Sequence, residues 1–389
     1  MSNGFSASKI IIGFVVSAVI IFLAYFLYSN YSEKSIQNIG NGEGVPLSIE
    51  EETITEETPL VSVVAQGFEV PWGLVFLPDG GMLVTERKGT VRFESADGKL
   101  QDEPVIEITS VKQIGEGGLH GIDLHPDFES NNYVYFYYTY EGDTNSTQNR
   151  VVRYKYNNGE LRNEEIIIDA IPGASNHDGG RIKFGPDGFL YITTGDAQNP
   201  SLAQNTDSLA GKILRVTDEG SSVSGNPFGN EIYSYGHRNP QGIAWDDQGN
   251  LWATEHGPSG VWPNCCQDEL NFVEIGANYG WPDSVGDNTE EGVVAPVLHS
   301  GRNIWAPAGL AYLNDKFYFA GLRGNALYEV DIANGEPKLE VYFKNELGRL
   351  REVVAGPDGM LYVTTSNRDG RGIPKAGDDK ILRINPGKL

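Results

Sequence analysis

The segment FGPDGFLYITTGD, residues 184–196, shows the local pattern that decides the fold. An apolar residue leads into a PDG turn, and the alternating apolar residues that follow end in small hydroxyl and charged groups. Glycine and aspartate in a short turn between apolar runs of period two are typical of a β-hairpin. The segment therefore predicts two antiparallel strands joined by a tight turn.

Five more copies of this pattern, in which the turn is often but not always spelled PDG, recur along the chain at intervals of roughly 45 to 65 residues. They are FLPDGGMLVTER (76–87), LHPDFESNNYVYFYYT (124–139), WDDQGNLWATEHG (245–257), YLNDKFYFAGLRG (312–324) and AGPDGMLYVTTSNRDG (355–370). A repeat of this length fits one four-stranded propeller blade, and a closed ring of blades removes most exposed sheet edges. The six copies predict an all-β, six-bladed β-propeller, whereas a pair of β-sandwiches would give one turn motif no reason to recur.

The composition of the 389 residues agrees with many short strands and turns, because glycine (48 residues) and aromatic residues (11%) are frequent. The formal net charge of −24 would repel nucleic acid and anionic lipid. It favours cations as partners, although acidity that serves only solubility explains the charge equally well. We therefore expect no nucleic-acid partner.

The N-terminal segment IIIGFVVSAVIIFLAYFLY, residues 10–28, carries no charge and is long enough to cross a bilayer as a helix. It predicts one transmembrane anchor, with a cleaved signal peptide as the alternative. Lys9 precedes the span and the acidic stretch SIEEETITEETP (48–59) follows it, which predicts that residues 1–9 are cytoplasmic.

Residues 29–59 are mostly polar and predict an acidic, flexible linker. The propeller domain is then expected to span 60–389. Together these segments predict a single-pass protein of the cell membrane whose C-terminal domain lies outside the cytoplasm.

The chain has two cysteines, Cys265 and Cys266, and they are adjacent. They cannot close a normal loop, and no CxxC pattern for zinc or redox chemistry exists. A vicinal disulfide in an oxidising compartment and two unbonded loop cysteines are the alternatives, of which the second is favoured.

Loops of a propeller gather at the ends of the central channel, so residues distant in sequence can share one pocket there. His177 lies in SNHDGG, just before a predicted strand, and is a candidate general base. Asp196 ends the strand of the same repeat and could orient the imidazole. An ordinary solvated loop histidine is the alternative.

Two further groups of polar residues stand out. His237, Arg238, Asn239 and Gln241 form a dense polar loop, which indicates either a binding site or a hydrogen-bonded turn. Arg349 and Arg351 are two positions apart in a predicted strand, so both side chains lie on the same face, and Arg323 could add a third charge. These arginines either hold a carboxylate or are ordinary surface residues. No GxGxxG, P-loop, HExxH or GxSxG motif appears, so redox chemistry would need a cofactor other than a nicotinamide.

Between residues 71 and 386 the chain resembles the glucose/sorbosone dehydrogenases, a family of soluble aldose sugar dehydrogenases that use pyrroloquinoline quinone (PQQ). The motifs that carry the resemblance follow in family order: PWGLVFLPDGGMLVTER, GEGGLHGIDLHPDF, HDGGRIKFGPDGFLYITTGD, LAGKILRV, YGHRNPQGIAW, EHGP, DELNFVEIGANYGWP and LREVVAGPDGMLYVTT. The resemblance implies a propeller that oxidises an aldose at its anomeric carbon by hydride transfer to PQQ, assisted by Ca²⁺. The electron acceptor stays unknown.

The resemblance also implies roles for single residues. His177 matches the general base, Asp196 the carboxylate that orients it, and Arg238 the arginine beside the reacting carbonyl. His177 and Arg238 also match the PQQ site, together with Glu116, Asn239, Gln241, Arg323, Arg349 and Arg351. The backbone carbonyls of Gly257 and Pro258 match the Ca²⁺ site at the cofactor, and Glu269 and Tyr279 match a structural Ca²⁺ site.

Two positions depart from the family pattern. Glu116 stands where family members commonly have a glutamine, and a carboxylate would repel an anionic quinone unless it were protonated or turned away. The loop 259–267, which holds both cysteines, is longer than its family counterpart and is expected to alter the pocket rim. A calcium-dependent lactonase and a non-catalytic propeller that binds glycans or proteins are the alternative functions.

Overall fold

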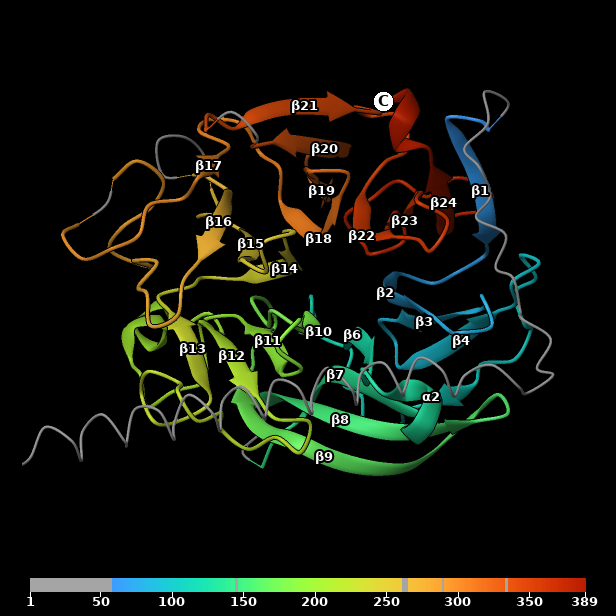
Figure 1. Cartoon of the computed structure of the whole chain (residues 1–389), viewed down its shortest axis with the longest axis horizontal. Coiled ribbons are helices and arrows are strands. Elements are labelled where there is room, and N and C mark those ends of the chain that lie inside the picture. The colour runs from blue at the N-terminus through green and yellow to red at the C-terminus, as the bar shows by residue number, and fades with distance from the viewer. Residues whose placement is uncertain (1–57, 144–145, 261–264, 289, 333–334) are drawn as a thin grey trace, which may run out of the picture. The chain divides into compact units, whose positions relative to one another are not determined.

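The computed structural model of the protein describes residues 58–143, 146–260, 265–288, 290–332 and 335–389. Within them, six four-stranded antiparallel sheets form a ring (Figure 1). The first strands of most neighbouring sheets contact one another around the centre of the ring. The predicted all-β, six-bladed propeller is therefore confirmed.

Each blade is numbered in chain order. Blade 1 consists of β2 (Pro71–Phe76), β3 (Met82–Glu86), β4 (Thr90–Glu94) and β5 (Ile106–Glu107). Blade 2 consists of β6 (Leu119–Leu124), β7 (Tyr133–Glu141), β8 (Thr147–Asn157) and β9 (Glu160–Pro172), with the short helix α2 (Phe128–Asn131) before β7. Blade 3 consists of β10 (Ile182–Phe184), β11 (Leu190–Thr194), β12 (Lys212–Val216) and β13 (Ile232–Tyr235), with a 3₁₀ turn at Pro200–Gln204.

The second half of the ring repeats this arrangement. Blade 4 consists of β14 (Pro240–Trp245), β15 (Leu251–Glu255), β16 (Glu269–Val273) and β17 (Leu298–His299). Blade 5 consists of β18 (Pro307–Leu313), β19 (Lys316–Gly321), β20 (Ala326–Asp331) and β21 (Lys338–Tyr342). Blade 6 consists of β22 (Leu350–Ala355), β23 (Leu361–Thr365), β24 (Lys380–Ile384) and β1 (Val61–Gln66), and a 3₁₀ turn at Pro386–Lys388 follows it.

Blade 6 closes the ring with strands from both ends of the domain. Strand β1 pairs antiparallel with β24, from Val61 opposite Ile384 to Gln66 opposite Lys380. The first strand of the domain thereby covers the outer edge of its last blade, and that edge is not left open.

Each sequence repeat forms the hairpin between the first two strands of a blade. In the repeat that begins at Phe184, Gly188 has a φ of 79° and its N–H donates to the carbonyl of Gly185. The Asp187 carboxylate accepts a hydrogen bond from the N–H of Phe189 at 3.3 Å. A PDG sequence suits this turn because aspartate caps it and glycine adopts the left-handed conformation.

Hydrophobic clusters fill the spaces between neighbouring blades. Strand β7 shows how one strand serves two of them: Phe136 and Tyr138 pack toward blade 1, and Tyr135 and Tyr137 pack toward blade 3. Alternate residues of a strand point to opposite faces, and both faces of the blade are covered. This double burial explains the run YVYFYY, which is apolar on both faces of the strand.

The predicted transmembrane segment 10–28 and the predicted linker 29–59 fall almost entirely outside the described residues, so both stay predictions. Among the residues that are described, no helix is long and apolar enough to cross a membrane.

Candidate active site

One end of the ring collects most of the polar residues that the sequence singles out. Antiparallel strands alternate in direction, so the loop after each second strand and the link to the next blade emerge at the same end. A cavity of about 650 Å³ lies there. It is lined by Arg87, Glu116, Asn176, His177, Gln198, Arg238, Gln241, His256, Gly257, Pro258, Ser259, Cys265, Cys266, Asp268, Ile304, Ala306, Leu322, Arg323, Arg349, Arg351, Asp369 and Arg371.

His177 lies in the link between blades 2 and 3 and is paired with a buried carboxylate. Its Nδ1 lies 2.8 Å from Oδ1 of Asp196, whose Oδ2 accepts a hydrogen bond from Nε1 of Trp281 at 2.8 Å. Gly195 permits this approach, because a Cβ there would lie 1.8 Å from the carbonyl oxygen of His177. The predicted pair is thus assembled, and Nε2 of His177 makes no hydrogen bond within the described residues.

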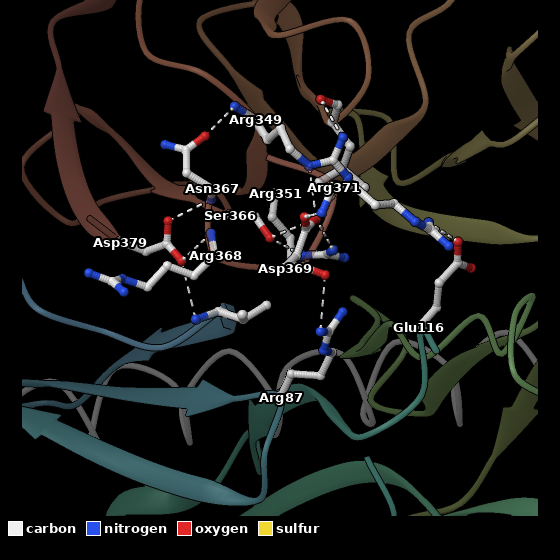
Figure 2. A network of polar contacts seen from close by, with 12 residues as sticks. Arg87, Glu116, Arg349, Arg351, Ser366, Asn367, Arg368, Asp369, Arg371 and Asp379 are labelled. Atoms are coloured by element: carbon white, nitrogen blue, oxygen red, sulfur yellow. Dashed lines mark hydrogen bonds and ion pairs between the residues drawn. The ribbon is translucent and has the colours of Figure 1, made fainter. Parts of the chain in front are cut away.

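Two predicted arginines and one that the sequence analysis missed contact a single residue, Asp369 (Figure 2). Asp369 accepts hydrogen bonds from Arg349 at 2.8 Å, Arg351 lies 3.6 Å from the same oxygen, and Arg87 donates to the Asp369 backbone carbonyl at 3.3 Å. Burial lowers the pKa of Arg351 to about 9. The charge of Asp369 opposes this effect, whereas the charges of Arg87 and Arg349 add to it. Three guanidinium groups beside one carboxylate leave an excess of positive charge, which suits an anion.

The dense polar loop 237–241 divides between the cavity and the protein interior. Arg238 lines the cavity, donates to the carbonyl of His256 at 3.3 Å and lies 5.3 Å from the Trp281 ring centroid. Gln241 also lines the cavity. His237 is fully buried between Ser234 and Glu255, so it serves the fold.

Asn239 from the same loop is fully buried and is not among the residues that line the cavity. Its Oδ1 accepts a hydrogen bond from the N–H of Gly179 at 3.0 Å, which ties this loop to the one that carries His177. Its Nδ2 has no partner within the described residues. Arg323 does line the cavity, but its side chain is largely exposed at the rim.

Glu116 lines the cavity and is ion-paired with Arg371. The departure from the family pattern is therefore compensated by a residue that sequence reasoning did not single out. Arg87, Asp369 and Arg371 were missed in the same way. A signal was present, since Arg87 and Asp369 lie in the polar tails of two repeats, TER and SNRDG, just as Asp196 does.

Gly257 and Pro258 form part of the cavity wall, as the prediction requires. The Gly257 N–H donates to Asp268 at 3.0 Å. Neither the Gly257 nor the Pro258 carbonyl oxygen accepts a hydrogen bond from the described part of the chain, so both remain free for a cation.

Cys265 and Cys266 also line the cavity and are joined by a disulfide. The favoured interpretation of two unbonded cysteines is therefore wrong. Adjacent cysteines are compatible with either state, and the sequence carried no signal that could separate them. The remainder of this loop, 261–264, lies outside the described residues.

Glu269 and Tyr279 line a second, smaller cavity that shares Arg238, His256, Gly257 and Pro258 with the first. Burial raises the pKa of Glu269 to about 8, and the nearby charge of Glu255 adds to this effect. Two carboxyl groups in one buried space favour a cation between or beside them. Within the described ranges, no group of three or more His, Cys, Asp or Glu residues is placed to hold a metal ion.

A further cavity of about 410 Å³ opens at the other ends of the innermost strands, where Phe76, Trp245 and Tyr312 are found. None of the residues that the sequence predicts for the site lines this cavity. The predicted chemistry is therefore confined to one end of the ring.

The sequence profile of the glucose/sorbosone dehydrogenase family matches residues 68–382, which is most of the chain. The chain belongs to this family. The predicted resemblance is thus confirmed. As a member of this family, the protein is a sugar oxidoreductase built on the propeller described above.

Named relatives of this glucose/sorbosone dehydrogenase agree. The aldose sugar dehydrogenase YliI of Escherichia coli is 34% identical over 359 residues, covering 84% of this chain and 92% of the relative. The quinoprotein glucose dehydrogenase B of Acinetobacter calcoaceticus is 30% identical over 264 residues, covering 59% and 54%. The PQQ-bound structure of aldose sugar dehydrogenase from Streptomyces coelicolor is 40% identical with a TM-score of 0.78, covering 84% of this chain and 97% of that one.

Proposed function

We propose that this glucose/sorbosone dehydrogenase oxidises an aldose at its anomeric carbon with PQQ as cofactor and Ca²⁺ as an aid. The observation that carries the proposal is that one cavity holds both a carboxylate-oriented histidine, His177, and an excess of guanidinium groups at Arg349 and Arg351. A base and an anion-binding site at one place are what sugar oxidation by an anionic quinone requires.

The residues present fit such a cofactor. Three cavity-lining residues carry a buried polar atom without a partner in the described part of the chain: Arg87 Nε, Gln241 Oε1 and His256 Nε2. Buried polar groups are normally hydrogen-bonded, so these atoms indicate a polar ligand. Arg349 and Arg351 would hold its carboxylates, with Arg323 at the rim and Gln241 beside it. Asn239 would act one step away, by supporting the loop of His177.

The proposed chemistry divides between cofactor and protein. When bound, the quinone supplies the hydride acceptor. His177 takes the proton of the anomeric hydroxyl at Nε2, because Asp196 holds Nδ1 and thereby selects the tautomer. Arg238 supplies positive charge beside the reacting groups, where negative charge develops on oxygen.

Two calcium sites complete the proposal. The Gly257 and Pro258 carbonyl oxygens would hold the ion next to the cofactor, since hard cations prefer oxygen ligands. Glu269 and Tyr279 would hold the structural ion. The Tyr279 hydroxyl already donates to the carbonyl of Phe272 at 2.6 Å, so Tyr279 would contribute through its backbone.

The decisive experiment measures dye reduction by the purified full-length protein with PQQ, Ca²⁺ and a panel of aldoses. Turnover that needs PQQ supports the proposal. PQQ binding without turnover of any sugar would point instead to a non-catalytic propeller, and lactone hydrolysis that persists after PQQ is removed would point to a lactonase.

We expect Ca²⁺ to stabilise the fold through Glu269. Because an ion bound only by the folded state adds to its free energy of unfolding, saturating Ca²⁺ should raise the Tm of the EDTA-treated protein by about 5 °C. Glu269→Gln removes the charged ligand of the structural ion and should abolish the part of this rise that the structural ion contributes. Glu329→Gln, at a buried glutamate paired with Lys316 outside both cavities, should leave it intact. An unchanged response in Glu269→Gln would contradict the assignment.

We also propose that residues 10–28 anchor the protein in the cell membrane with the propeller outside the cytoplasm. The uncharged span supports this proposal, and so does the Cys265–Cys266 disulfide, because disulfides persist in oxidising compartments. Fractionation should recover the protein with membranes, and protease added to intact cells with a permeable outer layer should digest it. Recovery in the soluble cytoplasmic fraction would contradict this proposal.

A further inference from the structure

Glu116 is a carboxylate in a cavity that is otherwise built for an anion. Its Oε1 accepts a hydrogen bond from Nη1 of Arg371, and Nη2 of Arg371 donates to Oδ1 of Asn176 at 3.0 Å. The two charged residues are 255 positions apart in the sequence. Their contact joins the link between blades 1 and 2 to the loop between β23 and β24.

The same carboxylate supports the loop that carries the proposed base. Oε2 of Glu116 accepts a hydrogen bond from the N–H of His177 at 3.3 Å, and the Glu116 N–H donates to the carbonyl of Ser175 at 2.8 Å. His177 has a φ of 64°, a left-handed conformation that is uncommon for residues other than glycine. The loop therefore depends on such outside contacts to hold its shape.

Arg371 is also connected to the arginine cluster at Asp369 (Figure 2). Its backbone N–H donates to Oδ1 of Asp369 at 2.9 Å, while Oδ2 of Asp369 holds Arg349. A continuous series of contacts thus runs from the proposed base loop, through Glu116 and Arg371, to the proposed cofactor clamp.

The charge of Glu116 persists at neutral pH. Burial raises the pKa of this carboxyl, but the hydrogen bond and the charge of Arg371, together with the hydrogen bond from the His177 N–H, outweigh burial and bring the pKa to about 2. An anionic ligand would therefore meet a full negative charge on Glu116 unless Arg371 neutralised it. The Arg371 side chain is 54% exposed and that of Glu116 is 22% exposed, so the pair lies at the cavity rim.

We propose that Arg371 is a positioning residue that neutralises Glu116, so that the cavity accepts an anionic cofactor, and that fastens the loop 175–177. The inference rests on the proposed function, because it takes PQQ as the ligand. It assigns Arg371 an indirect role in affinity, exerted through Glu116 rather than through contact with the cofactor.

The test is a double-mutant cycle read out by the Kd of PQQ for the full-length apoprotein with Ca²⁺, followed by absorbance. Arg371→Gln leaves the Glu116 charge uncompensated and should weaken PQQ binding by about 10- to 100-fold. Glu116→Gln removes that charge and should bind PQQ within about three-fold of the wild type, or more tightly. The double variant should return to within about three-fold of the wild type.

Two controls separate charge compensation from a general loss of structure. Arg371→Lys keeps the charge and should bind PQQ nearly as well as the wild type. Arg368→Gln changes an arginine of the same loop that does not line the cavity and should have no effect. A thermal melt of each apoprotein shows whether it is folded.

The outcomes are distinguishable. A double variant as weak as Arg371→Gln would overturn the inference, because Arg371 would then act without Glu116. Equal Kd values for wild type and Arg371→Gln would overturn it as well, with the proposed function untouched. A wild-type protein that binds no PQQ would overturn the proposed function and the inference together.

Discussion

Replacing His177 with alanine should lower kcat/KM for aldose oxidation by roughly 10²- to 10⁴-fold, the usual contribution of a general base. The Kd of PQQ should change by less than about three-fold, because the imidazole acts on the sugar hydroxyl and the arginines hold the cofactor. Asp196→Asn should also lower kcat, since the amide no longer selects the tautomer with Nε2 free. Stopped-flow reduction of the PQQ-loaded protein and PQQ titration measure the two quantities separately.

A matched histidine provides the control. The His299 side chain is 20% exposed, close to the 18% of His177, and it lies 3.1 Å from the Asp287 carboxylate, but it does not line the cavity. His299→Ala should therefore retain turnover. Equal losses in both alanine variants, or none in His177→Ala, would contradict the assignment of His177 as the base.

Replacing Arg351 with methionine should weaken PQQ binding by about 100-fold or more, because the variant loses a buried guanidinium that would pair with a carboxylate of PQQ. Methionine keeps much of the side-chain length, so the effect reports the charge. The expected measurement is a PQQ titration of the apoprotein, and turnover at saturating PQQ should fall far less than affinity.

Arg153 offers a control of equal burial. The side chains of Arg153 and Arg351 are both 7% exposed, but Arg153 pairs with Glu165 in blade 2, away from the cavity. Arg153→Met should cost stability without changing the Kd of PQQ. A similar loss of affinity in both variants would mean that Arg351 acts on the fold and not on the ligand.

Local patterns were sufficient to predict the blades and part of the site. A PDG turn with alternating apolar residues specifies a hairpin within a dozen residues, so repetition alone revealed the six blades. His177 and Asp196 were predictable because they belong to one blade, and Arg349 and Arg351 because strand alternation puts them on one face.

Contacts between distant blades could not be predicted from such patterns. Arg87 and Asp369 meet only because the ring closes, and residues 282 positions apart in the sequence carry no local sign of their contact. The same holds for Glu116 and Arg371. For the loop of His237 the sequence left a binding site and a hydrogen-bonded turn open, and the structure shows this histidine buried and hydrogen-bonded to Ser234 and Glu255.

The pairing of β1 with β24 has a consequence for biosynthesis. Within the domain, Val61–Gln66 is synthesised before every other strand and Lys380–Ile384 after every other strand, so β1 must wait without its native neighbour until β24 has been made. Domains of this size otherwise begin to fold during synthesis, and unpaired strands are prone to aggregation. A nonsense codon at position 380, which removes β24, should therefore leave a nascent chain whose ring of blades cannot close and which depends on chaperones.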